Sequence, residues 1–241
     1  MNKKPVDFFT KEAAQLYDQK NSKLFPISDC VHFLMGLILK DIPARSRILC
    51  VGAGTGAEIL SLSRSFPEWR FLALDPSLAM LDLCRERVEA AGVADRCEFV
   101  HGYVQDLPDE AVFDAVLSVF VAHFVARDQR SGFYRHMTNR LRKDGYLIDV
   151  EISFDLDSAE FPSMLKNWEA LQTLMGATPD SLASLPKQLK EILTVLPPTE
   201  TEALIRESGL GCPVRFFQSL MIHGWYGKKT QIPGCGQTEV T

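Results

Sequence analysis

The stretch that decides the fold is Ile48-Leu49-Cys50-Val51-Gly52-Ala53-Gly54-Thr55-Gly56-Ala57-Glu58. Its apolar first half, which ends in a glycine, is typical of a strand that is buried on both faces. Gly52 allows a tight turn off the strand, Gly54 lets a ligand approach bare backbone, and Gly56 lets a helix begin close by. Backbone amides at the start of a helix favour negative charge or hydrogen-bond acceptors. The stretch therefore predicts a strand, a ligand-binding turn and a helix.

An acidic residue follows the turn at the spacing that a nucleotide-binding site uses. Asp75 ends the next apolar run, about 20 residues after the turn. A carboxylate at the tip of the second strand can hold both hydroxyl groups of a ribose. Gly52, Gly54 and Ala57 also satisfy the dinucleotide pattern G-x-G-x-x-A. An adenosine-containing ligand is therefore expected, and the turn alone leaves its class open.

Strands and helices alternate along the middle of the chain. Apolar runs predict strands at 47–51, 70–75, 97–101, 113–119 and 145–152, and helical spacing predicts helices at 58–66, 77–91 and 129–142. Strands separated by helices form right-handed βαβ units and a parallel sheet. The predicted class is α/β, with a doubly wound, Rossmann-like sheet. A helix at 201–208 and two adjacent antiparallel strands at 214–218 and 220–226 follow.

The same patterns divide the chain into four parts. Helical spacing between residues 7 and 40 predicts an N-terminal helical cap over 1–45. The core comprises 46–154 and 199–227, and it is interrupted by a helical lid insertion at 155–198. That insertion contains helical patterns around 161–175 and 182–196. The polar, glycine-containing end, 228–241, is expected to be a flexible tail.

Composition limits the location and the partners of the protein. The chain has 241 residues, a formal charge of −5, 46% hydrophobic and 24% charged residues, which are ordinary globular values. The acidic balance argues against a protein that coats nucleic acid. No apolar run reaches the ~18 residues of a membrane span, and no apolar segment follows the start. The six cysteines form no CxxC pair and no metal-ligand spacing. We expect a cytoplasmic protein without a metal or a membrane.

The chain resembles the class I S-adenosylmethionine-dependent methyltransferases over about residues 7–227. Five motifs carry this resemblance because they occur in the usual order and at the usual intervals. They are Val51-Gly52-Ala53-Gly54-Thr55-Gly56, Leu74-Asp75-Pro76-Ser77-Leu78-Ala79-Met80, Val100-His101-Gly102-Tyr103-Val104-Gln105-Asp106-Leu107-Pro108, Phe113-Asp114-Ala115-Val116-Leu117-Ser118, and Leu141-Arg142-Lys143-Asp144-Gly145-Tyr146-Leu147. The early Ala13-Ala14-Gln15-Leu16-Tyr17-Asp18 resembles the A-x-x-Y-D helix of one branch. That branch includes small-molecule methyltransferases and carboxy-S-adenosylmethionine synthase.

The resemblance implies a fold, a cofactor and a set of binding residues. The fold is a seven-stranded sheet whose last strand is antiparallel, and the cofactor is S-adenosylmethionine, with S-adenosylhomocysteine as the product. The turn would carry the methionine part of the cofactor through Gly52, Ala53, Gly54 and Gly56, and the tip of strand two would hold the ribose through Asp75 and Pro76. Met80, Gln105 and Asp106 would contact the adenine. Val119 and Phe120, at the end of strand four, would lie beneath the sulfonium, and Tyr17 would cap the cofactor.

One position departs from the family pattern. Position 50 is commonly Asp in this motif, and here it is Cys50. A cysteine does not supply that carboxylate, and Glu58 is a candidate to orient cofactor groups instead.

Two residues are candidates for contact with the acceptor. Methyl transfer depends mainly on alignment, and a base is needed only when the acceptor must lose a proton. His123 follows strand four, close to the expected transfer point, and is the base candidate; the competing interpretation is a histidine that packs in the loop. Glu151, near the end of strand five, would face the same cleft and bind a cationic or hydroxyl substrate, or remain a solvated carboxylate.

Several functions stay open. The main hypothesis is methyl transfer to a small-molecule acceptor that the sequence does not identify. The alternatives are an NAD(P)-binding oxidoreductase, disfavoured because no Tyr-x-x-x-Lys occurs, and a non-catalytic cofactor-binding partner protein, which Cys50 favours. The carboxy-cofactor synthase would need a cation for its extra carboxylate, and 155–198 contains three lysines but no arginine. RNA contact through the basic residues of 135–143 is the weaker option for a partner, and a homodimer is left open.

Overall fold

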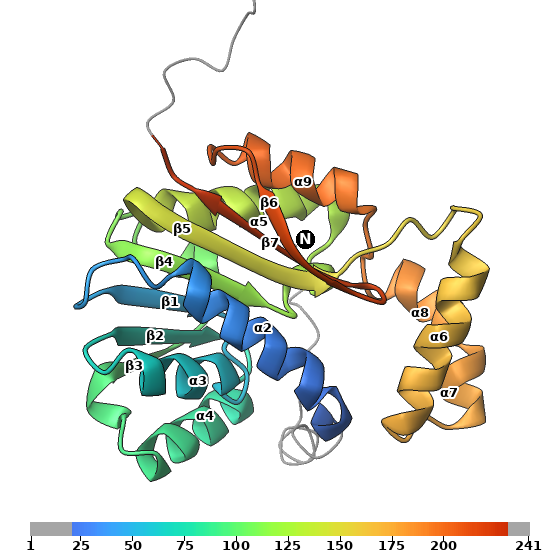
Figure 1. The fold of residues 1–241 in the computed structure, drawn as a ribbon, viewed down its shortest axis with the longest axis horizontal. Helices are drawn as coiled ribbons and strands as arrows, with labels where there is room; N and C mark the ends of the chain where they lie inside the picture. The colour runs from blue at the N-terminus through green and yellow to red at the C-terminus, as the bar shows by residue number, and fades with distance from the viewer. Residues whose placement is uncertain (1–20, 231–241) are drawn as a thin grey trace, which may run out of the picture.

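A seven-stranded sheet runs through the middle of the computed structural model, which describes residues 21–230 (Figure 1). The strand order is β3-β2-β1-β4-β5-β7-β6. The strands are β1 (Arg47–Val51), β2 (Arg70–Asp75), β3 (Cys97–His101), β4 (Phe113–Val119), β5 (Leu141–Ile152), β6 (Val214–Ser219) and β7 (Ile222–Lys228). β1 to β5 pair in parallel, whereas β7 is antiparallel to both β5 and β6. The predicted α/β class and the antiparallel last strand are confirmed.

Helices cover both faces of this sheet (Figure 1). The helices are α2 (Phe25–Ile38), α3 (Ala57–Ser65), α4 (Leu78–Ala90), α5 (Arg127–Arg140), α6 (Phe161–Leu174), α7 (Pro179–Ala183), α8 (Leu185–Glu191) and α9 (Pro198–Glu207). One core cluster joins the sheet to α2, α3 and α4, and a second joins it to α5 and α9. The parallel strands are therefore buried on both faces, as a doubly wound sheet requires.

The two core clusters explain why the short strands are so apolar. On one side, Met35 of α2 and Ile59 of α3 are fully buried with Ile48 of β1. On the other side, Tyr134 of α5 and Ile205 of α9 pack in the second cluster. Burial of each large apolar side chain stabilises the fold by about 1.5–3 kcal/mol.

Some element boundaries differ from those predicted. β5 begins at Leu141 rather than at 145, because Leu141 already pairs with Phe113 before the register shifts. β7 continues to Lys228, so the first residue of the predicted tail is the last residue of a strand. The predicted helix at 129–142 is α5, which begins and ends two residues earlier.

The inserted segment after β5 contains three helices instead of the predicted two. Pro179 and Pro186 lie at the starts of α7 and α8, where their missing N–H groups do no harm. Trp168 of α6 and Leu189 of α8 pack in the first core cluster. Figure 1 shows α6, α7 and α8 as a group beside the carboxyl end of β5. Of the predicted N-terminal cap, residues 1–20 lie outside the described residues, and the described part is mainly α2.

Candidate active site

The glycine turn after β1 closes against the end of β2. The backbone N–H groups of Gly52 and Ala53 both donate to the carbonyl oxygen of Leu74, at 2.7 and 3.0 Å. Gly52, Gly54 and Gly56 have φ angles of 65°, 53° and 79°, in the left-handed region that favours glycine. The turn is therefore fixed at the carboxyl edge of the sheet, where open α/β sheets bind their ligands.

Two of the three glycines are also required by their neighbours. A Cβ atom on Gly52 would lie 2.4 Å from Cγ2 of Val121, and one on Gly56 would lie 2.6 Å from Sγ of Cys84. Among the described residues, a Cβ atom on Gly54 would meet only one atom within 4 Å. The outer glycines thus allow close packing, and the middle one leaves a cradle of bare backbone that a cofactor can approach.

Asp75 is tied directly to this cradle. Its Oδ2 accepts from the N–H of Gly54 and its Oδ1 accepts from the N–H of Ser77, both at 2.8 Å. The side chain is only 6% exposed. An acceptor-only carboxylate fixed beside open backbone fits the hydroxyl groups of a ribose, because those groups donate hydrogen bonds. The residues present therefore fit an adenosine-containing cofactor.

The other predicted cofactor residues that follow β2 and β3 lie on the loops and short helices after these strands. Pro76 is exposed, and its carbonyl oxygen lies 2.9 Å from Nε2 of His101 at the end of β3. Gln105 and Asp106 are exposed on a short 3₁₀ helix after β3, and Met80 is buried on α4. Their contacts with adenine stay predictions.

The end of β4 has an unusual backbone. Phe120 has a φ of 59°, which is uncommon outside glycine, and its N–H donates to the carbonyl oxygen of Val150 at 2.6 Å. Val119 and Phe120 are both half-buried. Such strain persists only where neighbours fix it, and it often marks a functional site. Tyr17, the predicted cap of the cofactor, lies outside the described residues.

Cys50, where the sequence departs from the motif, has the carboxyl group of Glu58 near it. Cys50 is fully buried in β1, and burial raises the pKa of its thiol well above the usual range. Glu58 is 7% exposed on the first turn of α3. Burial raises the pKa of Glu58 to about 7, and the charge of Asp75 acts in the same direction. The prediction that Glu58 orients cofactor groups stays a prediction.

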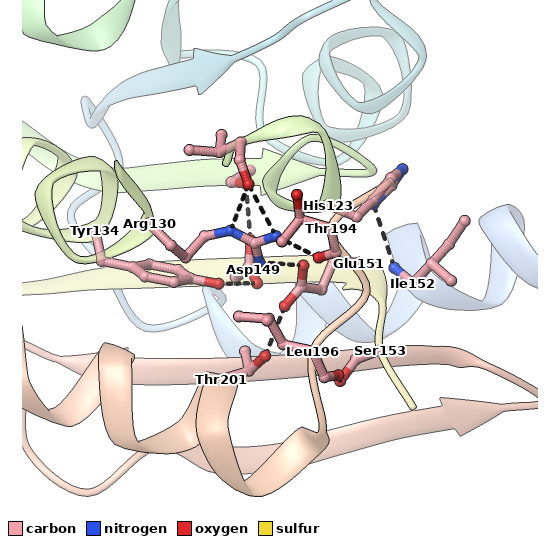
Figure 2. Close-up of polar contacts among 12 residues, drawn as sticks. His123, Arg130, Tyr134, Asp149, Glu151, Ile152, Ser153, Thr194, Leu196 and Thr201 are labelled. Carbon is pink, nitrogen blue, oxygen red and sulfur yellow. Dashed lines mark hydrogen bonds and ion pairs between the residues drawn. The ribbon is translucent and has the colours of Figure 1, made fainter. Parts of the chain in front are cut away.

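Figure 2 shows a buried polar cluster close to the end of β5. The side chain of Arg130, on α5, is completely buried. Its Nη1 donates to Oε2 of Glu151 at 2.7 Å, and its Nη2 donates to the carbonyl oxygen of Thr194 at 2.8 Å. The carbonyl oxygen of Val125 accepts from the same guanidinium at 3.4 Å. Oε1 of Glu151 accepts from the hydroxyl of Thr201 at 2.8 Å.

A second carboxyl group belongs to this cluster. Asp149 accepts from the hydroxyls of Ser118 at 2.7 Å and Tyr134 at 2.9 Å. Burial raises the pKa of both carboxyl groups, and the neighbouring Asp149 raises that of Glu151 further, against the opposing effect of Arg130. Two buried carboxyl groups therefore lie near one guanidinium, and the pKa of Glu151 is raised by burial and by its neighbour Asp149.

Glu151 therefore differs from the expected cleft residue. Its side chain is 0% exposed, and both carboxylate oxygens are used within the protein. The physical reason is the alternation of β5, which directs positions 149 and 151 to the face covered by α5 and α9. The structure consequently gives Glu151 a place in the buried cluster, bound to Arg130, instead of an open contact with substrate.

His123 lies on the short 3₁₀ helix after β4, and it is also buried. Its Nδ1 accepts from the N–H of Ile152 at 3.3 Å, and its carbonyl oxygen accepts from the N–H of Thr194 at 2.7 Å. Burial lowers the pKa of His123 to about 3, and the charge of Arg130 lowers it as well. A ring with this pKa remains neutral at physiological pH, which makes it a weak general base.

The two ends of the inserted segment are fastened to each other near His123. The carbonyl oxygen of Leu196 accepts from the N–H of Phe154 at 3.0 Å and from the hydroxyl of Ser153 at 2.7 Å. His123 contacts the outgoing end through Ile152 and the returning end through Thr194. The inserted segment therefore starts and ends at the carboxyl end of β5. This is the edge of the sheet that also carries the glycine turn.

Sequence reasoning missed the central residue of this cluster. Arg130 shares one face of α5 with Tyr134 and Met137, which are buried at helical spacing. A cation at helical spacing among buried apolar positions is the signal that would have found it. Thr194, which accepts from Arg130, and Thr201, which donates to Glu151, come from far along the chain and have no local signal.

Comparisons with known proteins place the chain among methyltransferase-like sequences. Residues 48–145 match the family model that is described as a methyltransferase domain. A carboxy-S-adenosyl-L-methionine synthase from Klebsiella pneumoniae is 24% identical over 162 residues. That alignment covers 63% of this chain and 65% of the relative.

Solved structures show the same fold. An S-adenosyl-L-methionine-dependent methyltransferase from Methanococcus maripaludis superposes with a TM-score of 0.65 at 17% identity, covering 96% of this chain and 97% of the other. Human N-acetylserotonin methyltransferase, solved in complex with S-adenosylmethionine, gives a TM-score of 0.64 at 14% identity, covering 92% of this chain and 57% of the other.

Between residues 21 and 230, no helix combines the length and the apolar character that a bilayer crossing requires. Within the same residues, no group of three or more His, Cys, Asp or Glu side chains is arranged to hold a metal ion.

The packing of the turn predicts that Gly56→Ala is strongly destabilising. The new Cβ would meet Sγ of Cys84 at 2.6 Å and keep an unfavourable positive φ, so we expect a loss of about 2–4 kcal/mol in the free energy of unfolding. Gly92→Ala is a matched control, because Gly92 has a φ of 71° but nothing within 4 Å of its Cβ position. Urea unfolding should show a smaller loss for Gly92→Ala. A partial recovery of Gly56→Ala by Cys84→Ala would identify the collision, and equal losses at Gly56 and Gly92 would contradict it.

The buried cluster predicts a pH-dependent effect of Glu151→Gln. Because its pKa is raised, folded Glu151 keeps a proton that the unfolded chain releases above the ordinary value of 4.5. This group's contribution to stability is complete below pH 4.5 and falls as the pH rises toward the higher folded pKa. The melting temperature of Glu151→Gln relative to wild type should therefore rise between pH 5 and pH 8. Glu151→Ala should lose about 3–5 kcal/mol, because it leaves Arg130 without this partner.

The exposed Glu98→Gln controls for the loss of one carboxylate. A difference in melting temperature between Glu151→Gln and wild type that stays constant with pH, or that moves in favour of wild type at higher pH, would contradict a raised pKa of Glu151.

Proposed function

We propose, from the premise that residues 48–145 of this chain form a class I methyltransferase domain, that the protein transfers a methyl group from S-adenosylmethionine to a small-molecule acceptor. The observation that carries this proposal is the open backbone at Gly54 with the carboxylate of Asp75 fixed beside it. When bound, S-adenosylmethionine supplies a methyl group already activated on a sulfonium sulfur.

The chain's own residues would bind and orient the reactants. Gly52, Gly54 and Gly56 would receive the methionine part of the cofactor along bare backbone, and Asp75 would hold the ribose. Val119 and Phe120 would close the site beneath the reacting sulfur, where the contact of Phe120 with Val150 fixes the loop. Exclusion of water and alignment of the acceptor supply the rate that this chemistry requires. S-adenosylhomocysteine would be the product.

The inserted helices support a small acceptor. Both ends of residues 155–198 are fastened at the tip of β5, so α6, α7 and α8 stand beside the edge at which an acceptor must enter (Figure 1). We propose that this segment forms a lid over the acceptor. The free cysteines of the described residues support a reducing, cytoplasmic location.

Carboxylation of the cofactor is the competing reaction, because relatives carry the name carboxy-S-adenosyl-L-methionine synthase. That reaction needs a cation for an additional carboxylate. The three lysines of the insertion, Lys166, Lys187 and Lys190, are exposed, and Lys190 contacts Asp157 at 2.9 Å. The buried Arg130 is already bound to Glu151. These contacts favour methyl transfer, and mass spectrometry of the nucleoside product separates the two reactions.

RNA contact and a homodimer stay predictions. In the basic run at 135–143, Arg140 is 1% exposed and Arg142 pairs with Asp114 at 3.0 Å. These two side chains are engaged within the protein, whereas Arg135 and Lys143 of the same run are exposed.

Titration calorimetry of Asp75→Ala tests the proposed cofactor site. Loss of charged hydrogen bonds worth about 1.5–3 kcal/mol should weaken binding of S-adenosylhomocysteine by roughly 10- to 150-fold. Asp114→Ala is the matched control, because Asp114 is a similarly buried carboxylate that accepts from the N–H of Arg47 at the opposite end of the sheet. The affinity of Asp114→Ala for S-adenosylhomocysteine should match that of wild type. Unchanged affinity in Asp75→Ala would remove this residue from the site.

NADH serves as the ligand control. Binding of NADH in preference to both sulfur compounds would favour the dinucleotide alternative. Binding of S-adenosylmethionine without any labelled product would favour a cofactor-binding partner protein.

A further inference from the structure

His123 has a defined tautomer, because one ring nitrogen is already committed. A backbone N–H can only donate, so Nδ1 must present a lone pair to Ile152. In a neutral imidazole, the proton then resides on Nε2. The side chain therefore offers an N–H donor at Nε2.

The surroundings of His123 keep it neutral. Arg130 of α5 is the cation that faces it, and Glu151 of β5 is bound to that cation. Burial and the charge of Arg130 both disfavour imidazolium, which is why the pKa of His123 falls to about 3. At neutral pH the ring can donate at Nε2 but does not take up a second proton.

The free side of the ring points away from the polar cluster. Figure 2 shows the second ring nitrogen of His123 directed away from Arg130 and Glu151. Among residues 21–230, no protein group accepts a hydrogen bond from Nε2, and the side chain is 3% exposed. Two residues earlier, Val121 fills the space beside Gly52, so the loop that carries His123 packs on the glycine turn.

We propose that His123 binds the acceptor as a hydrogen-bond donor through Nε2–H, and that the acceptor is a small molecule whose methylated group is a carboxylate. This inference rests on the proposed methyl transfer and names the substrate class for that same site. One carboxylate oxygen would accept from Nε2, and the other would remain free to attack.

The step balances without a base. A lone pair of the free carboxylate oxygen forms the new O–C bond while the C–S bond breaks, and its electron pair goes to sulfur. The sulfonium and the carboxylate charges cancel, giving a neutral methyl ester and S-adenosylhomocysteine. No proton moves, and His123 keeps its own.

The groups at the carboxyl ends of β4 and β5 suit a carboxylate acceptor better than they suit an amine acceptor. An amine is protonated at neutral pH and must lose a proton before it attacks, whereas a carboxylate is already ionised. Glu151 and Asp149, the carboxyl groups nearest on β5, are held by Arg130, Thr201, Ser118 and Tyr134. Neither is placed to remove a proton from a bound acceptor.

Two conservative variants separate the donor role from the structural role. His123→Asn keeps a carbonyl that can accept from Ile152, but it is too short to place a donor at the Nε2 position. His123→Gln places an amide N–H near that position and has no basicity. We expect kcat/KM of His123→Gln to stay within about tenfold of wild type, and that of His123→Asn to fall by about 10²–10³-fold. Melting temperatures and S-adenosylhomocysteine affinities of both variants show whether the fold and the cofactor site are intact.

The product chemistry is tested with methyl-tritiated S-adenosylmethionine and a library of small carboxylic acids, phenols and amines. A methyl ester releases volatile tritiated methanol in alkali, whereas methyl ethers and methylamines do not. Alkali-labile label, together with a wild-type rate that is level from pH 7.5 to pH 5.5, would support the proposal.

Three outcomes would overturn it: alkali-stable products only, no carboxylate used from the library, or His123→Gln no more active than His123→Asn with a wild-type rate that falls below pH 6.5. Failure of the protein to bind either sulfur compound would instead overturn the proposed function itself.

Discussion

The buried guanidinium of Arg130 determines how the segments around the end of β5 can be arranged. Transfer of an ion into the interior costs several kcal/mol, and only complete hydrogen bonding offsets that cost. Arg130 meets this requirement with the carboxylate of Glu151 and the carbonyl oxygens of Val125 and Thr194. Helix α5, strand β5, the loop after β4 and the returning end of the insertion must therefore lie within reach of one side chain. Displacement of any of them would leave a buried charge without a partner.

The glycine turn and the buried polar cluster are built from different groups. The turn, the proposed cofactor site, uses backbone: three left-handed glycines, two N–H groups on the carbonyl of Leu74, and a carboxylate fixed by further N–H groups. The cluster, beside the proposed acceptor site, uses buried side chains that hold a loop in place. Backbone geometry leaves a recurring signature in sequence, whereas a side-chain cluster depends on residues brought together only by the fold.

This difference explains what the sequence could and could not predict. β1, β2 and β4 begin and end at the predicted residues, because each is a short, largely buried run bounded by polar or glycine-containing segments. The spacing of the glycines and Asp75 along the chain also predicts that they lie together, as the contact of Asp75 with Gly54 shows. A position near the end of a strand does not indicate which face Glu151 occupies. Which face a strand residue occupies depends on the helices that cover it, and α9 comes 46 residues after β5 ends.

The cysteine at position 50 follows from the charges around it. Glu58 and Asp75 already place two carboxyl groups near the glycine turn, and burial, with a smaller effect of Asp75, raises the pKa of Glu58 to about 7. A third carboxylate at the fully buried position 50 would add repulsion and a further desolvation penalty. A neutral thiol avoids both. The buried carboxyl group of Glu58 lies instead on the first turn of α3, the helix that follows β1.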